Sequence, residues 1–170
     1  MAKEKMWGLL VHLSMNIHDQ VYPTLQFDEG MWDWILEEAP KHGINTILLD
    51  VADGIQFHSH PEISISDAWS HRRVHQELAR CREKGITVIP KLNFSSLHCK
   101  WLKQYARMIS TDIYYRVAAD LIREVYEVFE QPTYIHLGMD EEDAAHAGCS
   151  ELAVYRHKDL LWHDLQYLFD

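Results

Sequence analysis

The sequence predicts a parallel α/β fold built from successive β-α units, and two features of the 170-residue chain indicate it. Short, continuously apolar segments alternate with longer segments of helical periodicity, and strands that are apolar on both faces are typical of a parallel sheet flanked by helices. No GxGxxG or Walker-type sequence follows any of the apolar segments, which disfavours the nucleotide-binding versions of this class. The pattern leaves open whether the sheet is an open, doubly wound one or part of a barrel.

The first two units pair an apolar strand with an amphipathic helix. The first unit has its strand at 7–15 and its helix at 27–43, and the second has its strand at 44–52 and its helix at 66–85. Asp28 is the expected N-cap of the first helix, because its side chain can accept the free amides of the first turn. Gly43 and Gly85 follow the two helices and are expected to end them, since glycine readily adopts a left-handed conformation.

The third and fourth units follow the same plan. The third unit has its strand at 86–94 and its helix at 110–131, and the fourth has its strand at 133–139 and its helix at 151–170. The third helix carries an apolar stripe at helical spacing, formed by Val117, Leu121, Val125 and Val128. We therefore expect four strands and four helices in a single domain that spans residues 1–170, in keeping with the length of the chain.

Composition limits the classes of partner. The chain has 26 acidic and 16 basic residues and a formal net charge of −10, so it repels phosphate backbones and nucleic acid is not expected as a partner. No apolar run reaches the length of about 18 residues that a transmembrane helix needs, so no membrane partner is expected. The three cysteines are widely spaced and form no CxxC pair, which favours a reducing, cytoplasmic location.

Polar side chains gather where each predicted strand ends. They are His12, Ser14, Asn16, His18 and Asp19 after the first, Asp50, Asp53, His58 and His60 after the second, Lys91, Asn93 and His98 after the third, and His136, Asp140 and Glu141 after the fourth. Parallel α/β folds place their chemistry at the carboxyl ends of the strands. We therefore expect these side chains to form one functional cleft, with Lys91 as a charge partner for Asp140.

The segment PTYIHLGMDEED ends the last predicted strand on a glycine and four consecutive acids. Strand side chains alternate, so Gly138 and Asp140 are expected on the same side as His136, with Glu141 just past the strand end. Adjacent carboxylates disfavour each other's ionisation, which favours one of them holding a proton, as a general acid must. Gly138 leaves room for a ligand or for another backbone.

The next two acids, Glu142 and Asp143, are expected to be surface or helix-capping residues, because acids suit a helix N-terminus. The alternative interpretation of Asp140–Glu141, as solvated capping acids, stays open on the residues alone.

Three motifs resemble the family-twenty glycoside hydrolases, the β-N-acetylhexosaminidases. INTILLDVADGIQFHSHPEI resembles the second strand and loop of that family, and KGITVIPKLNFSSLH resembles its third strand. YIHLGMDEE resembles the signature H-hydrophobic-G-G-D-E. The resemblance covers about residues 7–145 and implies a (β/α)8 TIM barrel, of which this chain supplies the first four β-α units, a half barrel.

The resemblance also implies a substrate-assisted, retaining glycosidase that needs no cofactor and no metal. Glu141 would be the general acid, and Asp140 would orient the 2-acetamido group of the substrate, which acts as the nucleophile. The substrate would be a carbohydrate, with an N-acetylhexosaminide as the first candidate. Further substrate-binding residues would be His136, His98, Asp50, Asp53, Lys91, Asn93 and His12.

The sequence departs from the family pattern at four positions. Met139 replaces the second glycine of the signature, and Lys91 and Asn93 replace an acidic pair on the third strand. Trp7 stands where the family has an arginine that grips sugar hydroxyls, whereas His98 matches the terminal histidine of its motif. These departures make another sugar or another glycoside a candidate substrate.

Two other functions remain open. One is a truncated, non-catalytic barrel that binds carbohydrate or has lost activity, because a complete barrel needs about 250 residues. The other is a metal-dependent TIM-barrel isomerase or hydrolase, whose candidate ligands are His12, Asp50, His98, His136 and Glu141. A half barrel leaves two open strand edges, so we expect a homodimer or a higher association through them.

Overall fold

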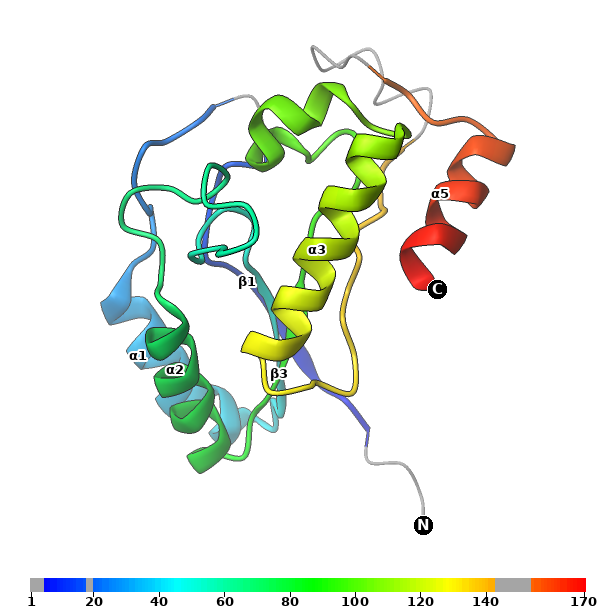
Figure 1. Cartoon of the computed structure of the whole chain (residues 1–170). Helices are drawn as coiled ribbons and strands as arrows, with labels where there is room; N and C mark the ends of the chain where they lie inside the picture. Colours follow the sequence, from blue (N-terminus) through cyan, green and yellow to red (C-terminus); the bar gives the residue numbers. More distant parts are fainter. Residues whose placement is uncertain (1–4, 18–19, 143–153) are drawn as a thin grey trace.

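The computed structural model describes residues 5–17, 20–142 and 154–170 and contains a three-stranded parallel sheet with helices between the strands (Figure 1). The strands are β1 (Gly8–His12), β2 (Thr46–Asp50) and β3 (Thr87–Lys91), in the spatial order β1-β2-β3. The predicted α/β class is confirmed. Within the described ranges the sheet is open, and no closure into a barrel is seen.

The segment 133–139, expected as a fourth strand, runs beside β3 but forms only an isolated parallel bridge between His136 and Lys91. The His136 amide donates to the Pro90 carbonyl oxygen at 2.9 Å, and the Leu92 amide donates to the His136 carbonyl oxygen at 2.9 Å. The chain leaves the extended conformation at Gly138, whose φ is +62°.

The helices are α1 (Glu29–Glu38), α2 (His71–Glu83), α3 (Asp112–Val128) and α5 (Asp159–Phe169), with 3₁₀ helices η1 (Ala39–His42) and η2 (Lys100–Arg107). Side-chain oxygens of Asp28, Ser70 and Thr111 cap α1, α2 and α3 by accepting first-turn amides. Gly43 and Gly85 adopt left-handed φ values of +78° and +72° where the first two helical segments end. Within the described residues, no helix is both long and apolar enough to cross a membrane.

Two helices begin later than their sequence patterns predict. The expected helix at 66–85 begins at His71, because Trp69 forms a parallel bridge with Ile55 and its amide donates to the Gly54 carbonyl oxygen at 2.8 Å. The expected helix at 151–170 begins at Asp159; residues 154–158 are not helical, and 151–153 lie outside the described residues. The 3₁₀ helix η2 was not expected from the sequence.

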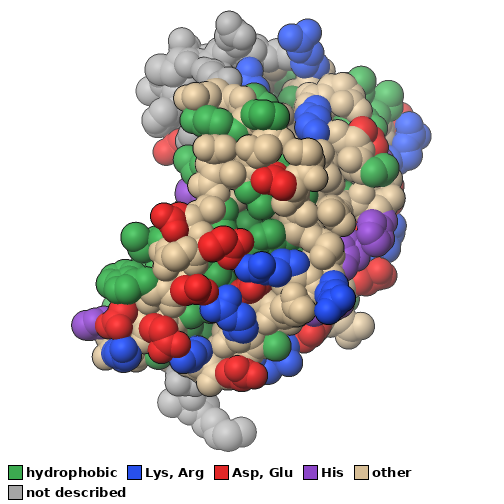
Figure 2. Space-filling view, turned by 90° about the vertical axis from the view of Figure 1, so that its left-hand side faces the viewer, with side chains coloured by type: hydrophobic (Ala, Val, Ile, Leu, Met, Phe, Trp, Pro, Cys, Tyr) green, Lys and Arg blue, Asp and Glu red, His purple; other side chains and the backbone are tan. Residues whose placement is uncertain are grey.

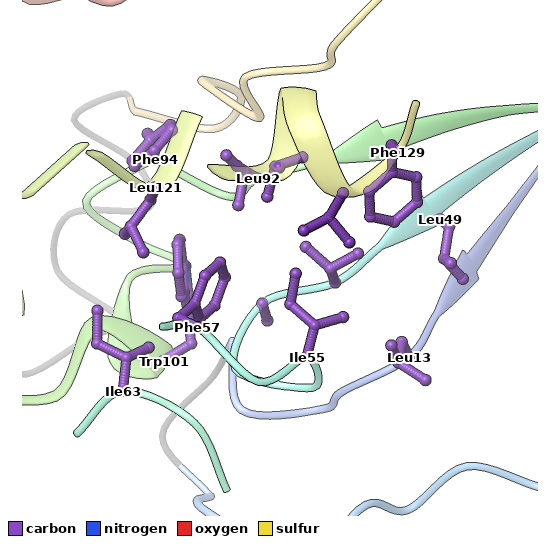
Figure 3. Close-up of a cluster of buried hydrophobic side chains, with 14 of the residues drawn as sticks. Leu13, Leu49, Ile55, Phe57, Ile63, Leu92, Phe94, Trp101, Leu121 and Phe129 are labelled. Atoms are coloured by element: carbon purple, nitrogen blue, oxygen red, sulfur yellow. The ribbon is translucent and has the colours of Figure 1, made fainter. Parts of the chain in front are cut away.

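The helices cover one face of the sheet, where the main core lies. Ile47 and Leu49 of β2 are buried against Trp32 of α1 and Val74 of α2. The apolar stripe of α3 is buried as predicted, at Val117, Leu121, Val125 and Val128. Figure 3 shows Leu121 with core residues from the loops that follow the strands, among them Ile55, Phe57, Ile63, Phe94 and Trp101. On the opposite face of the sheet, Leu10 is 47% exposed.

A ladder of ion pairs joins α1 to α2 at the surface. The pairs are Glu29–Arg73 at 2.7 Å, Asp33–Arg80 at 2.5 Å and Glu37–Lys84 at 2.5 Å. The acids recur every four residues along α1, so they share one helix face. In the lower part of Figure 2, where these helices face the viewer, acidic and basic side chains are intermixed. Exposed pairs of this kind add little stability, so the ladder mainly selects how the two helices pair.

A buried arginine ties α5 to the segment after β3. Arg156 is 0% exposed, and its guanidinium donates to the carboxylates of Glu142 and Asp164 and to the Phe94 carbonyl oxygen. The Glu142 side chain is only 1% exposed. The expectation that Glu142 is a surface or capping residue is therefore wrong, because a cation from farther along the chain neutralises it. Asp143, expected to play the same part, lies outside the described residues.

We predict that Arg156→Met lowers the free energy of unfolding by about 3–5 kcal/mol, because it leaves two buried carboxylates without their cation. Urea denaturation measures the change. Arg123→Met is the matched control: Arg123 is 66% exposed and pairs with Asp120 one turn away, so its loss should change stability by no more than about 0.5 kcal/mol. Equal losses for the two variants would contradict the structural role of Arg156.

Candidate functional site

The last residues of the strands form a row across the end of the sheet. His12 lies opposite Asp50, Asp50 lies opposite Lys91, and the isolated bridge places His136 beside Lys91. Residues that are register partners in a parallel sheet point to the same face. Four of the polar residues expected at the strand ends are therefore brought together. We call this set the strand-end row.

Asp50 is the centre of the strand-end row. It is fully buried, and its Oδ2 atom lies 3.1 Å from His12 Nδ1, accepts a hydrogen bond from Asn93 Nδ2 at 2.9 Å, and lies 3.5 Å from Lys91 Nζ. Lys91 is 6% exposed, so its charge and that of Asp50 offset each other inside the protein. The charge partner of Lys91 is thus Asp50 rather than Asp140, as the register across β2 and β3 requires.

Two buried oxygen atoms in this group lack donors. Asp50 Oδ1 and Asn93 Oδ1 have no hydrogen-bond partner within the described residues. Buried acceptors normally have a hydrogen-bond donor as partner, and leaving one without a donor costs folding free energy.

Asp140 and Glu141 form a second group with His98. Glu141 Oε2 lies 3.2 Å from His98 Nε2, and one polar atom from each of the three residues lies within 4.8 Å of the others. His98 is 7% exposed, whereas the Glu141 side chain is 51% exposed. Glu141 also has a φ of +64°, a conformation that non-glycine residues rarely adopt and that is common at functional sites.

Gly138 connects the acidic group to the strand-end row. A Cβ atom there would lie 2.7 Å from both Asn93 Oδ1 and the Leu92 carbonyl oxygen, so the room that the glycine leaves is filled by the chain that directly follows β3. The Gly138 amide also donates to His136 Nδ1 at 3.0 Å. These contacts hold the turn that leads from the row to the acids.

We predict that Gly138→Ala lowers the free energy of unfolding by about 3 kcal/mol, from the positive φ and from the clash with β3. Gly43→Ala is the matched control, because Gly43 has a φ of +78° and nothing within 4 Å of the added Cβ atom. The control should lose only about 1 kcal/mol. Thermal or urea unfolding compares them, and a loss no larger at Gly138 than at Gly43 would contradict the close approach.

Asp53 joins two of the loops that surround the row. Its carboxylate accepts hydrogen bonds from Ser14 Oγ at 2.5 Å and from Asn16 Nδ2 at 2.8 Å, and the residue is 1% exposed. Burial raises the pKa of Asp53, and the hydrogen bonds from Ser14 and Asn16 only partly oppose this. Both carboxylate oxygens are engaged, which favours a positioning role for Asp53. His18 and Asp19, from the same predicted cluster, lie outside the described residues.

His58 and His60 contact α3. The His58 amide donates to Glu124 at 2.6 Å, and His60 Nε2 lies 3.3 Å from Asp120 Oδ2. These two histidines of the predicted cleft thus pair with helix residues and have no contact with the strand-end row in the part of the chain that the structure describes.

The ligands expected for a metal-dependent enzyme separate into two places. His98 and Glu141 lie together with Asp140, with ligand atoms within 4.8 Å. The other three candidates are in the strand-end row and do not belong to that group: His12, Asp50 and His136. The five residues therefore do not surround one point, which disfavours the single metal centre that they were expected to form.

Comparison with known proteins does not identify a family. No protein-family model matches the chain. A search of curated proteins also finds no match. The resemblance to glycoside hydrolases therefore rests on the three sequence motifs.

Proposed function

We propose that the protein is a glycoside hydrolase-like enzyme that acts on a carbohydrate, with Asp140 and Glu141 as its catalytic pair. The observation that carries the proposal is the route of the segment 133–141. It runs parallel to β3 and ends in two exposed acids, Asp140 and Glu141, at the same end of the sheet as the ligand-type polar residues of the strand-end row. Parallel α/β enzymes place their catalytic groups at this end.

The proposed roles follow from the exposure and contacts of each acid. Glu141 is exposed enough to reach a glycosidic oxygen and acts as the general acid, with His98 Nε2 at 3.2 Å orienting its carboxyl group. Asp140, also exposed, orients a 2-acetamido group of the substrate, which attacks the anomeric carbon. Substrate-assisted hydrolysis needs no second carboxylate on the opposite face of the sugar, so two adjacent acids suffice.

The strand-end row supports a carbohydrate as the substrate. His12 and His136 are not fully buried and can contact a sugar from the same row. An N-acetylhexosaminide is the first candidate, because its acetamido group would supply the nucleophile.

We predict that Glu141→Gln and Asp140→Asn each reduce hydrolysis of the best aryl glycoside by roughly 10²- to 10⁴-fold, because each removes a group that acts in the transition state. A panel of chromogenic aryl glycosides, including N-acetylhexosaminides, measures the rates. Glu83→Gln is the control, because Glu83 is an exposed carboxylate at the opposite end of α2 and should leave the rate unchanged. Equal background rates for wild type and both site variants would refute the hydrolase.

A carbohydrate-binding protein without catalysis is the second candidate. It is favoured by the strand-end row, whose His12 and His136 are not fully buried and do not depend on the acidic pair. In that case wild type binds sugars without cleaving them. Asn93→Ala then weakens binding, whereas Glu141→Gln leaves it unchanged.

We also infer that the sheet is the first half of a (β/α)8 barrel and that copies of the chain associate through the uncovered face and edges. Leu10 on this face is 47% exposed, and nearby in sequence Trp7 is 55% exposed. Among the described residues, β1 has β2 as its only strand neighbour, so its outer edge is open to pairing. Exposed apolar surface of this kind favours association.

We predict that light scattering at micromolar concentration gives a mass of at least two chains, and that Leu10→Lys shifts it toward one chain. Trp34→Lys is the control, because Trp34 is 61% exposed on α1, on the helical side of the sheet, and should leave the mass unchanged. A wild-type mass of 20.0 kDa would refute the association.

A further inference from the structure

A second cluster of ligand-type side chains lies where the loop after β2 meets α2 and α3. His58, His71 and Glu124 have ligand atoms within 4.8 Å of one another. The two imidazole rings stack, with centroids 4.0 Å apart and planes at 26°. The residues line a surface hollow of about 420 Å³, and no residue of the strand-end row or of the Asp140–Glu141 group lines it.

The Glu124 carboxylate is held in place by the loop. It accepts hydrogen bonds from the His58 amide at 2.6 Å, the Ser59 amide at 2.9 Å and Ser59 Oγ at 2.5 Å. Burial raises the pKa of Glu124, but these hydrogen bonds and the neighbouring His71 outweigh it, so the pKa lies below its ordinary value. Of these loop donors, both from Ser59 bond to Oε2, whereas Oε1 accepts from the His58 amide alone and keeps a lone pair for a further partner.

The contacts of His71 select the tautomer that a metal ligand needs. His71 Nε2 lies 2.7 Å from the Gln56 carbonyl oxygen, which can only accept, and 3.2 Å from Glu124 Oε1, so in this structure Nε2 carries the proton and is shared between the two oxygens. In the neutral ring the lone pair is then on Nδ1. A ring N–H that donates to a backbone carbonyl is the usual second-shell support of a metal-bound histidine.

The surroundings of the hollow supply a further ligand and a favourable charge. His75 is exposed, lines the same hollow and follows His71 by four residues on α2, which places both imidazoles on one helix face. The charged residues that line the hollow are Asp120, Glu124 and Glu127 against Arg123. The balance of three acids against one base favours a bound cation.

We propose that His58, His71 and Glu124 form a binding site for a divalent transition-metal ion, with Zn²⁺ as the expected ion and His75 or water in the fourth position. Two imidazole nitrogens and one carboxylate oxygen suit zinc, whereas calcium and magnesium prefer oxygen ligands alone. The exposed His58 side chain turns to bring the ligand atoms to bonding distance. The ion links the loop after β2 to α2 and α3, a role that is independent of the proposed hydrolase.

We predict that the metal-free protein, purified without a histidine tag, binds one Co²⁺ ion with the visible absorption of a tetrahedral site, and that Zn²⁺ displaces it. Calorimetric titration with Zn²⁺ should show a weakening of at least about tenfold in His71→Ala and in His58→Ala, because each loses a direct ligand. Zn²⁺ should also raise the melting temperature of wild type but not of these variants. Neither His58 nor His71 is fully buried, so both variants are expected to fold, and circular dichroism verifies this.

Two control variants locate the ion. His42→Ala removes an exposed histidine at the end of η1, and His98→Ala removes the histidine of the Asp140–Glu141 group. Both should bind Zn²⁺ as wild type does. The proposal is overturned if wild type binds no Zn²⁺ below millimolar concentration, or if His98→Ala abolishes binding while His71→Ala does not.

Discussion

The buried carboxylate of Asp50 is the point on which the end of the sheet depends. One oxygen of this residue contacts groups from β1, from β3 and from the loop after β3, through His12, Lys91 and Asn93. A buried carboxylate is tolerated only when a cation and hydrogen-bond donors surround it. The register of the three strands supplies them, so the same contacts that stabilise the sheet also gather the polar side chains of the candidate site.

The position of Asp140 and Glu141 depends on two residues outside the pair, Gly138 and Arg156. Gly138 lets the chain approach β3 closely enough to continue the parallel pairing and then turn away. Arg156 neutralises Glu142, the acid next to the proposed catalytic pair, and holds it under α5. Two neighbouring acids thus have opposite surroundings: Glu141 is largely exposed beside His98, and the Glu142 side chain is buried against a guanidinium. This difference separates a group that can exchange protons with a substrate from one that stabilises the fold.

Two groups of histidines lie on surfaces with different chemistry. His12, His98 and His136 lie with carboxylates and amides at the strand ends, where a hydroxyl-rich ligand would find donors and acceptors. His58 and His71 lie with Glu124 near α3, where the tautomer and the acidic surroundings suit a cation. The sequence carries a signal for the second surface in the spacings His58-x-His60 and His71-x-x-x-His75, but only the packing of the loop on α3 adds Glu124.

The sequence by itself determined the α/β class, the first three strands, the N-cap of α1, the glycine stops of the first two helical segments and the buried stripe of α3, because periodicity, capping residues and glycine stops act over a few residues. It also indicated which polar residues follow the strands. The tertiary structure alone decided that 133–138 pairs with β3 through a single bridge, that Lys91 neutralises Asp50, and that Glu142 is buried. These outcomes depend on register and on partners from remote parts of the chain, such as Arg156. A local pattern of charge and hydropathy cannot specify them, because the energy of a buried charge depends on which group reaches it in space.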